Sequence, residues 1–400
     1  MSLCLKNKNS FLYFIAQIIS KFGDVLFHIA VMWYLLDSRD SLVSVGIAAM
    51  MKELPQLLFG FVSGVLVDKL NRKKLMIISD SISGTLTLGL TMVMFLGWEN
   101  NLLIYVLIFA LGVMDTVYSP ATRCFIRQIV NDEELVAANS LYNSISEVIS
   151  VIGIAISGVL ISWLGCFNVF VFNGITYVLG ALLIMLIPYT QASSRENQLF
   201  SRKDVALSLQ WIRNSSFTKA FIICIAISNI AYSIIYMMPS VLSKNVLGSG
   251  VGGYSMIECC VSLGMIVGAG FISMKRIRRA GLFFVIGSIL GAILMMTMSQ
   301  VDHILITMLI YFLFGISDAI TIPVFTYLQI TIPNEMQGRV YALIDIILMS
   351  VSPIGSFIVS CIIEQISLEV LFVISGFVLL IVAVYGYFNK AFFRSEIGSC

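Results

Sequence analysis

The chain has 400 residues, of which 59% are apolar and only 12% are charged, and its mean hydropathy is +0.98. Soluble domains carry about 25% charged residues, so this composition excludes a soluble globular protein and also a disordered chain. The net charge of +2 offers no basic surface for nucleic acid, and eight scattered cysteines with two histidines give neither a zinc-binding spacing nor a disulfide pattern. We therefore expect a membrane protein without a metal or cofactor.

Apolar stretches long enough to cross a bilayer, which needs about 20 residues per helix, recur along the whole chain. A hydrophilic stretch separates a first six-helix bundle at 1–190 from a second at 217–400, and we expect it to form a cytoplasmic central loop at 191–216. The fold class predicted is therefore all-α, with twelve transmembrane helices. Their approximate positions are 11–36, 42–67, 75–96, 102–126, 138–163, 166–188, 217–243, 251–273, 281–299, 303–328, 339–363 and 367–389.

The basic residues predict how these helices are oriented. With the N-terminus in the cytoplasm, 20 of the 24 lysines and arginines fall at or near cytoplasmic ends. Both termini are therefore expected in the cytoplasm. Lys6 and Lys8 precede the first apolar run as in a signal peptide, but no small-residue cleavage site follows, so this run is retained as the first helix.

The two halves of the chain resemble each other. Residues 109–132 align with 312–335, and both segments contain G-x-x-D-x-x-x-x-P, which pairs Asp115 with Asp318. Two six-helix halves of the same topology predict a pseudo-twofold axis along the membrane normal. Such an architecture places a substrate cavity at the midplane, between the halves.

The loop after the second helix, GVLVDKLNRKKL, resembles the signature of the major facilitator superfamily, although Asn71 replaces the usual glycine. SKFGD in helix one and PNEMQGRVYAL before helix eleven are similar to the bacterial drug-efflux branch, which includes macrolide exporters. The resemblance implies a monomer in the inner or plasma membrane of a bacterium. It also implies export of a lipophilic drug-like compound, such as a macrolide-type antibiotic, by proton antiport through alternating access.

One departure weakens the inference of antiport. Drug antiporters of this superfamily often carry a Gly-Pro motif in helix five, where this chain has Gly153 followed by Ile154. The corresponding segment of helix eleven keeps its proline, Pro353. The fold is therefore better supported by the resemblance than the direction of transport.

The loop signature implies a conformational lock on the cytoplasmic side. Asp68 and the basic residues after it would pair with groups near helices four, five and eleven, and this pairing would break when the transporter switches. The alternative is that the basic residues only set the topology. The residues assigned to the lock are Gly64, Asp68, Lys69, Arg72, Lys73 and Arg123.

Ionisable residues inside the spans are functional candidates, because each costs about 2.5–3.5 kcal/mol at the centre of a helix. Lys21, Asp24 and His28 share one face of helix one. Histidine titrates near neutrality, so Asp24 and His28 are a candidate proton-handling pair. Alternatively, Lys21 and Asp24 satisfy each other in a structural network.

Further residues complete the candidates for protons or cations and for the substrate cavity. Asp115, Glu147 and Asp318 follow Asp24 as coupling candidates, and the two repeated aspartates have a packing or gating role as their alternative. Lys52 and Glu53 are unusual so near the middle of helix two and are expected to tune which substrate is accepted. Asp80 and Glu258 carry less weight, because their positions in the sequence are less informative.

The partners expected are a small-molecule substrate, protons and the lipid bilayer. No nucleotide-binding P-loop and no catalytic triad occurs, so no enzyme activity is expected. Two alternatives remain open. The first is a permease or exporter of the same superfamily for a metabolite, siderophore or peptide. The second is a membrane protein that does not transport, such as a sensor or a self-immunity factor.

Overall fold

A computed structural model describes most of the chain, and nearly all of the described residues are helical. The only extended pairing among them is an isolated bridge between Arg279 and Glu396. The chain forms two compact units, the first comprising Met1–Ser44 and Met51–Asn197, and the second Val45–Met50 and Gln198–Cys400. The described ranges are 8–39, 42–97, 101–130, 135–188, 202–274, 278–333, 337–363 and 365–396.

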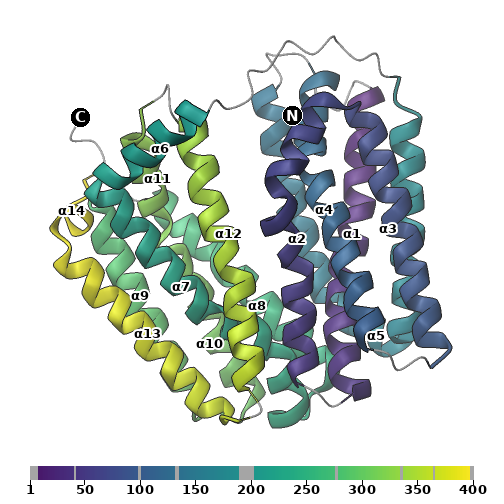
Figure 1. Ribbon diagram of the computed structural model, residues 1–400. Helices are drawn as coiled ribbons and strands as arrows, with labels where there is room; N and C mark the ends of the chain where they lie inside the picture. The colour runs from purple at the N-terminus through teal and green to yellow at the C-terminus, as the bar shows by residue number, and fades with distance from the viewer. Residues whose placement is uncertain are drawn as a thin grey trace. The chain divides into compact units, whose positions relative to one another are not determined.

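Apart from Val45–Met50 of α2, the first unit consists of five long helices (Figure 1): α1 (Lys8–Arg39), α2 (Leu42–Lys69), α3 (Arg72–Phe95), α4 (Asn101–Ile129) and α5 (Leu135–Met185). α1 packs along α5, and α3 packs against α4 and α5. α5 is interrupted at Gly165, whose φ of 78° and ψ of 159° are not helical. Glycine adopts a positive φ without the steric penalty of other residues. The interruption lies between the two spans predicted at 138–163 and 166–188.

The second unit contains α6 (Arg202–Asn214), α7 (Ser216–Val241), η2 (Leu242–Val246), α8 (Gly250–Met274), α9 (Ala280–Met298), α10 (Ile304–Ala319), α11 (Ile322–Thr331), α12 (Gln337–Ile362), α13 (Leu368–Phe388) and α14 (Lys390–Phe393). η2 is a single π-helical turn. α6 lies within the stretch expected to be a loop, and it packs against α7 and α12. It buries Ile212 and Ser208, whereas Leu207 and Leu209 are exposed. Its sequence is too short and too polar to be recognised as an apolar stretch.

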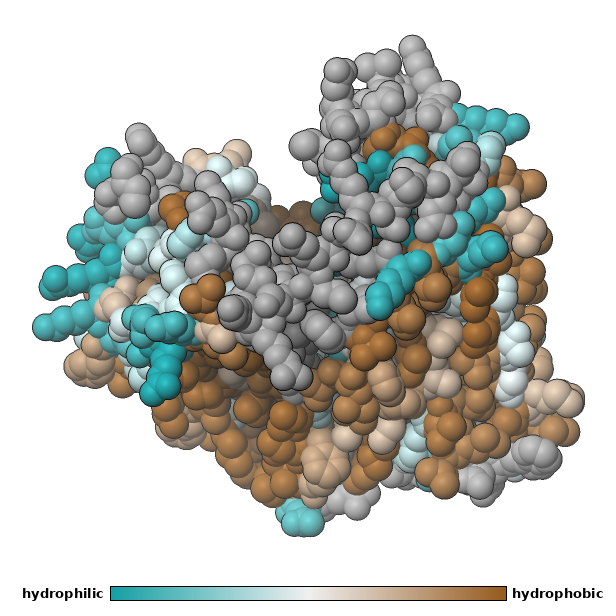
Figure 2. All heavy atoms as spheres, turned by 45° about the horizontal axis from the view of Figure 1, so that its top comes forward, coloured by the Kyte–Doolittle hydropathy of each residue, from teal (hydrophilic) through white to brown (hydrophobic). Residues whose placement is uncertain are grey.

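Within the described residues, nine helices are long and apolar enough to cross a membrane. One of them, Leu141–Met185, has 45 residues, about twice the length that a bilayer needs, and Gly165 divides it. Another, Ile304–Thr331, joins α10 and α11. The chain is therefore a multi-pass helical membrane protein, whose apolar surface is brown in Figure 2. The count of twelve spans stays a prediction.

The glycine of the repeated G-x-x-D motif has the same packing role in both units. A Cβ atom on Gly112 in α4 would overlap the backbone carbonyl oxygen of Lys52 in α2. A Cβ atom on Gly315 in α10 would overlap the backbone carbonyl oxygen of Val261 in α8. Small residues allow helix backbones to approach closely in membranes. The internal repeat therefore extends from sequence to helix packing.

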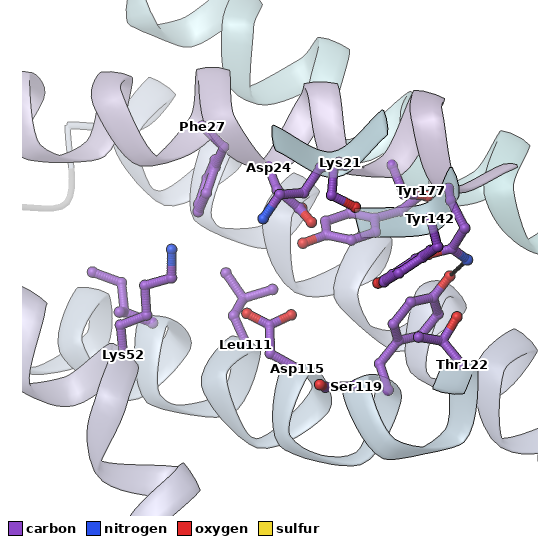
Figure 3. A pocket seen from close by; sticks show the side chains of 15 residues that line it. Lys21, Asp24, Phe27, Lys52, Leu111, Asp115, Ser119, Thr122, Tyr142 and Tyr177 are labelled. Atoms are coloured by element: carbon purple, nitrogen blue, oxygen red, sulfur yellow. Dashed lines mark hydrogen bonds between the residues drawn. The ribbon is translucent and has the colours of Figure 1, made fainter. Parts of the chain in front are cut away.

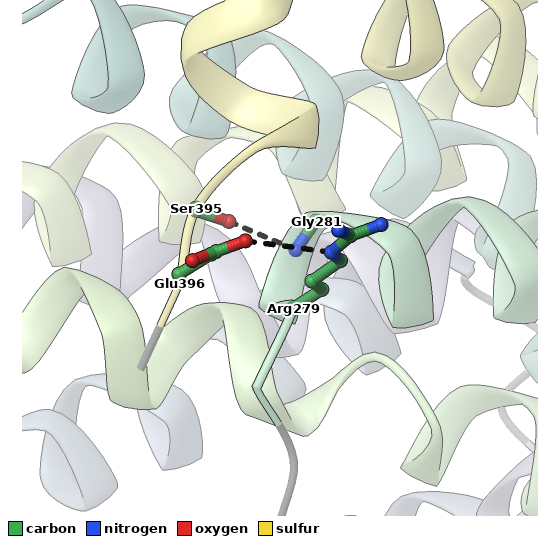
Figure 4. Close-up of polar contacts among 4 residues, drawn as sticks. All are labelled: Arg279, Gly281, Ser395 and Glu396. Atoms are coloured by element: carbon green, nitrogen blue, oxygen red, sulfur yellow. Dashed lines mark hydrogen bonds and ion pairs between the residues drawn. The ribbon is translucent and has the colours of Figure 1, made fainter. Parts of the chain in front are cut away.

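The start of α9 is capped by a segment far away in the sequence (Figure 4). Arg279, the residue before the helix, provides no side-chain cap. Instead, Ser395 accepts hydrogen bonds from two backbone N–H groups, that of Ala280 on its carbonyl oxygen (2.9 Å) and that of Gly281 on its Oγ (2.8 Å). Arg279 Nε also lies 3.4 Å from Glu396 Oε1. These contacts tie residues 395–396 to the beginning of α9.

We expect Ser395→Ala to destabilise the second unit by about 1–2 kcal/mol, the usual cost of removing a helix-capping side chain. Ser395 is only 1% exposed, so water cannot readily replace the lost acceptor for the Gly281 N–H. The measurement is the thermal unfolding midpoint in detergent. The control is Ser273→Ala, which removes an exposed hydroxyl bonded within its own helix. Equal midpoints for the two variants would contradict the capping role.

Candidate functional site

A cavity of about 360 Å³ lies inside the first unit, a volume typical of small-molecule pockets. Its walls come from α1, α2, α4 and α5. Two lysines and two aspartates line it, and Figure 3 shows all four pointing toward the cavity; they are Lys21, Asp24, Lys52 and Asp115. Four aromatic side chains line it as well, namely Phe27, Tyr118, Tyr142 and Tyr177. We call this site the charged cavity.

Helical periodicity explains how the sequence supplies these walls. On α1, Gln17, Lys21 and Asp24 are spaced by four and three residues, so their side chains lie on one face. On α4, Leu111 and Asp115 have the same spacing of four residues. Lys52 reaches the cavity from α2, which Gly112 holds close to α4. Distant parts of the chain thus bring two lysines and two aspartates together.

The charges inside the cavity interact with one another. Asp24 interacts with the Tyr177 hydroxyl, and it interacts electrostatically with Lys21 and Lys52. Asp115 lies within the fields of the same two lysines and of Asp24. One oxygen of Asp24, Oδ1, is buried and makes no hydrogen bond with any described residue. A buried carboxylate oxygen with no partner is well suited to receive a proton or a donor group of a ligand.

Side-chain hydrogen bonds fix one end of the cavity. Gln17 Nε2 donates to the Tyr118 hydroxyl at 2.7 Å, which joins α1 to α4. Deeper in the unit, the Tyr13 hydroxyl lies 3.1 Å from Thr122 Oγ1. Because both pairs are polar and are packed among apolar side chains, they hold the lining residues of α1 and α4 in register.

His28 contacts Lys52 rather than the aspartate one turn before it. Lys52 Nζ lies 3.4 Å from His28 Nδ1. An ammonium group can only donate a hydrogen bond, so a protonated Lys52 makes His28 Nδ1 the acceptor of this contact. The structure thus pairs His28 with a lysine, whereas the sequence suggested a pair with Asp24. His28 does not line the charged cavity.

Three other candidates lie outside the charged cavity. Glu53 and Glu147 are exposed, and neither lines the cavity. Asp318 belongs to the second unit, where it lies on α10 and interacts electrostatically with Tyr232 and Tyr236. Of the seven residues that the sequence proposed for coupling or substrate binding, Asp24, Lys52 and Asp115 share one cavity.

Two carboxylates that the sequence left as weaker candidates are placed prominently by the structure. Asp80 is 2% exposed in α3. It looked close to the end of a span because the helix was expected to begin at residue 75, whereas α3 begins at Arg72. Glu258 in α8 interacts electrostatically with Tyr254 and Tyr311. Lys69 and Lys275, like Arg72 and Arg278, are 206 residues apart in the two halves, and the same offset pairs Lys52 with Glu258.

The lock residues are only partly described. The side chain of Asp68 lies outside the described residues. Lys73 Nζ donates to the carbonyl oxygens of Met185 and Ile187 at 2.8 and 2.7 Å, so it caps the C-terminal end of α5 in its own unit, where a cation is favoured. Gly64 is half-buried in α2, and the exposed or partly exposed basic members are Lys69, Arg72 and Arg123.

Asn71, which stands where the family signature usually has glycine, has a local role. Its Oδ1 accepts a hydrogen bond from the Lys74 N–H at 3.0 Å, so Asn71 is the N-cap of α3. Asparagine is among the best N-cap residues. The departure from the signature therefore helps α3 to begin.

Comparison with known proteins gives relatives over most of the chain. The Major Facilitator Superfamily model matches residues 13–356. The uncharacterized MFS-type transporter YvqJ of Bacillus subtilis (strain 168) is 21% identical over 360 residues, 88% of this chain and 85% of that protein. The putative bacilysin exporter BacE of Bacillus amyloliquefaciens is 23% identical over 89% of each chain. Macrolide efflux protein A of Streptococcus pyogenes is 20% identical over 92% of each chain.

Solved structures share the fold at low sequence identity. The nucleoside transporter NupG superposes with a TM-score of 0.77 at 10% identity, over 96% of this chain and 99% of that one. A bacterial homolog of the human lysosomal transporter Spinster gives a TM-score of 0.75 at 12% identity, over 98% of each chain. With the family match over most of its length, the chain belongs to the major facilitator superfamily and is a multi-pass membrane transporter of small molecules, not an enzyme.

Proposed function

We propose that this transporter exports a small drug-like compound in exchange for protons, by alternating access between its two six-helix halves. The observation that carries the proposal is the convergence of Lys21, Asp24, Lys52 and Asp115 on one cavity. Ionisable groups inside a membrane are expensive and mark ion or substrate pathways. Here two carboxylates are available to hold either a proton or a basic group of the cargo.

The exchange follows from this competition. Asp24 and Asp115, when ionised, attract a basic nitrogen of the substrate, while the aromatic side chains around them offer ring faces to its apolar part. Protonation from the outside removes the negative charge and releases the cargo. Loss of the proton on the cytoplasmic side restores the site. A transporter that binds either a proton or the substrate, never both, couples the two gradients.

The relatives support export as the direction. The printed names of two of them describe a macrolide efflux protein and a putative bacilysin exporter. We further propose that the protein lies in the inner or plasma membrane of a bacterium, as a monomer with both termini in the cytoplasm. The distribution of lysine and arginine supports this orientation.

A second substrate class is favoured by one feature of the cavity. Lys21 and Lys52 line it beside the two carboxylates, so it presents both signs of charge to a ligand. A zwitterionic metabolite or a peptide would pair with both signs, whereas a purely cationic compound would face two lysines. The second candidate is therefore an exporter of a zwitterionic, peptide-like metabolite.

The test uses inside-out membrane vesicles from cells with and without the protein. After an imposed pH gradient has acidified the vesicle interior, a transported compound should release protons and increase the fluorescence of a quenched pH dye. The panel contains macrolides, lipophilic cations and zwitterionic peptides. A response to the first two groups supports drug efflux, and a response only to peptides supports the second candidate. No protein-dependent response to any compound would contradict proton-coupled export.

A further inference from the structure

A third carboxylate lies behind the charged cavity. Asp80 in α3 is 2% exposed, and its Oδ2 makes no hydrogen bond with any described residue. Burying an ionised carboxylate without a partner is strongly unfavourable. Asp80 therefore requires a positive charge close to Oδ2, supplied either by a bound proton or by a metal cation.

A hydroxyl group from another helix faces the same point. Ser20 in α1 is 4% exposed, and its Oγ also makes no hydrogen bond with a described residue. Both oxygens lie beside Gly180 in α5, because a Cβ atom there would be 2.5 Å from Ser20 Oγ and 3.3 Å from Asp80 Oδ2. The missing side chain of the glycine thus leaves room beside both the carboxylate oxygen and the hydroxyl oxygen. Ser20 also lines the charged cavity, so it connects the cavity with Asp80.

The groups that face Asp80 do not neutralise it. The charged groups that act on it are the carboxylates of Asp24 in α1 and Asp115 in α4. The other titratable neighbours are two tyrosines, Tyr118 in α4 and Tyr177 in α5. The two cavity lysines, Lys21 and Lys52, interact electrostatically with Asp24 and Asp115 instead.

The charges of this region do not balance. Among the described residues, the interior of the first unit holds three aspartates around the cavity, Asp24, Asp80 and Asp115, against the two lysines that line it. Acidic side chains in this region therefore outnumber basic ones by one.

We propose that Asp80 and Ser20 form a monovalent-cation site, for a proton or Na⁺, reached from the charged cavity through the Ser20 hydroxyl. Carboxylate and hydroxyl oxygens are ligands that suit a hard cation. The site deepens the proposed function by adding a coupling cation that does not share its carboxylate with the substrate. Its role in transport rests on that function, whereas cation binding is measured without any substrate.

The test follows the thermal unfolding midpoint of the purified full-length protein, because a ligand that binds only the folded state stabilises it. One arm raises NaCl at pH 8, with choline chloride keeping the ionic strength constant. The other arm lowers the pH from 8.5 to 5.5 without Na⁺. We expect the midpoint to rise by several degrees in at least one arm. A rise with Na⁺ identifies a sodium site, and a rise only with acid identifies a proton site.

Three variants connect the response to the site. Asp80→Asn keeps the size of the side chain and should remove the response. Gly180→Ala places a methyl group against both oxygens and should raise the cation concentration needed for the response at least tenfold. The control Asp302→Asn neutralises an exposed carboxylate and should respond as the wild type does. If Asp80→Asn and wild type respond alike in both arms, or if neither responds, the proposal is overturned.

This outcome is separate from that of the vesicle experiment. A protein that exports nothing in vesicles can still show an Asp80-dependent shift of its midpoint, in which case the cation site stands and the proposed function fails. Conversely, the Asp80→Asn protein can still export with proton coupling and show the same midpoint response as the wild type. That result removes the cation site and leaves the proposed function standing.

Discussion

Replacing Asp115 by asparagine is expected to abolish proton-driven export while the protein stays folded. Asparagine has nearly the same volume but cannot take up a proton, and the cavity then holds two lysines against one aspartate. Truncating one partner of a buried charge pair costs roughly 2 kcal/mol or more, which corresponds to a loss of at least about 30-fold in substrate affinity. The measurement is substrate-induced proton release from inside-out vesicles.

A matched control separates this effect from a general loss of charge. Asp302→Asn also converts an aspartate to asparagine, but at an exposed position before α10, and it should transport as the wild type does. Both variants should be expressed and remain monodisperse in detergent as the wild type does. Wild-type export by the Asp115→Asn protein would remove this carboxylate from the coupling mechanism.

Gly112→Ala is expected to destabilise the first unit by about 1–3 kcal/mol, the usual range for overpacking a closely packed interior. The added methyl group would overlap the Lys52 carbonyl oxygen and would also meet the ring of Pro55. α2 would have to move away from α4 and take Lys52 with it. The measurement is the yield of monodisperse protein in detergent together with its unfolding midpoint.

Two further glycines make this expectation specific. Gly315→Ala should have the same effect, because its methyl group would overlap the Val261 carbonyl oxygen in the second unit. Gly89→Ala should be neutral or stabilising, because a Cβ atom there meets nothing within 4 Å and alanine is the better helix former by about 1 kcal/mol. Equal stabilities for all three variants would show that the close helix contacts are unimportant.

Much of the fold is predictable from hydropathy, because a span must be long and apolar whatever it packs against. Hydropathy predicts two separate spans at 138–163 and 166–188, and the break at Gly165 lies between them. α6 was missed because only one of its faces packs on α7 and α12, which leaves a short, largely polar sequence. Tertiary contact, and not composition, makes residues 202–214 a helix.

The site was predictable residue by residue but not as an arrangement. The cost of an ion in a bilayer singled out Asp24, Lys52 and Asp115 individually. Their convergence depends on a backbone contact between α2 and α4 at Gly112, which no pattern of charges reveals. Asp80 was undervalued because its burial comes from neighbouring helices and not from its distance to the end of a span.

The cap that Ser395 provides for α9 has a consequence for biosynthesis. Helix α9 emerges from the ribosome long before Phe392 and Ser395 do, so its first N–H groups wait for acceptors that are made near the end of translation. Phe392, fully buried against Phe217 and Phe284, arrives equally late. Nascent chains that stop before these residues therefore lack the cap of α9. The N-terminus of α9 would then be partly unfolded and open to quality-control proteases.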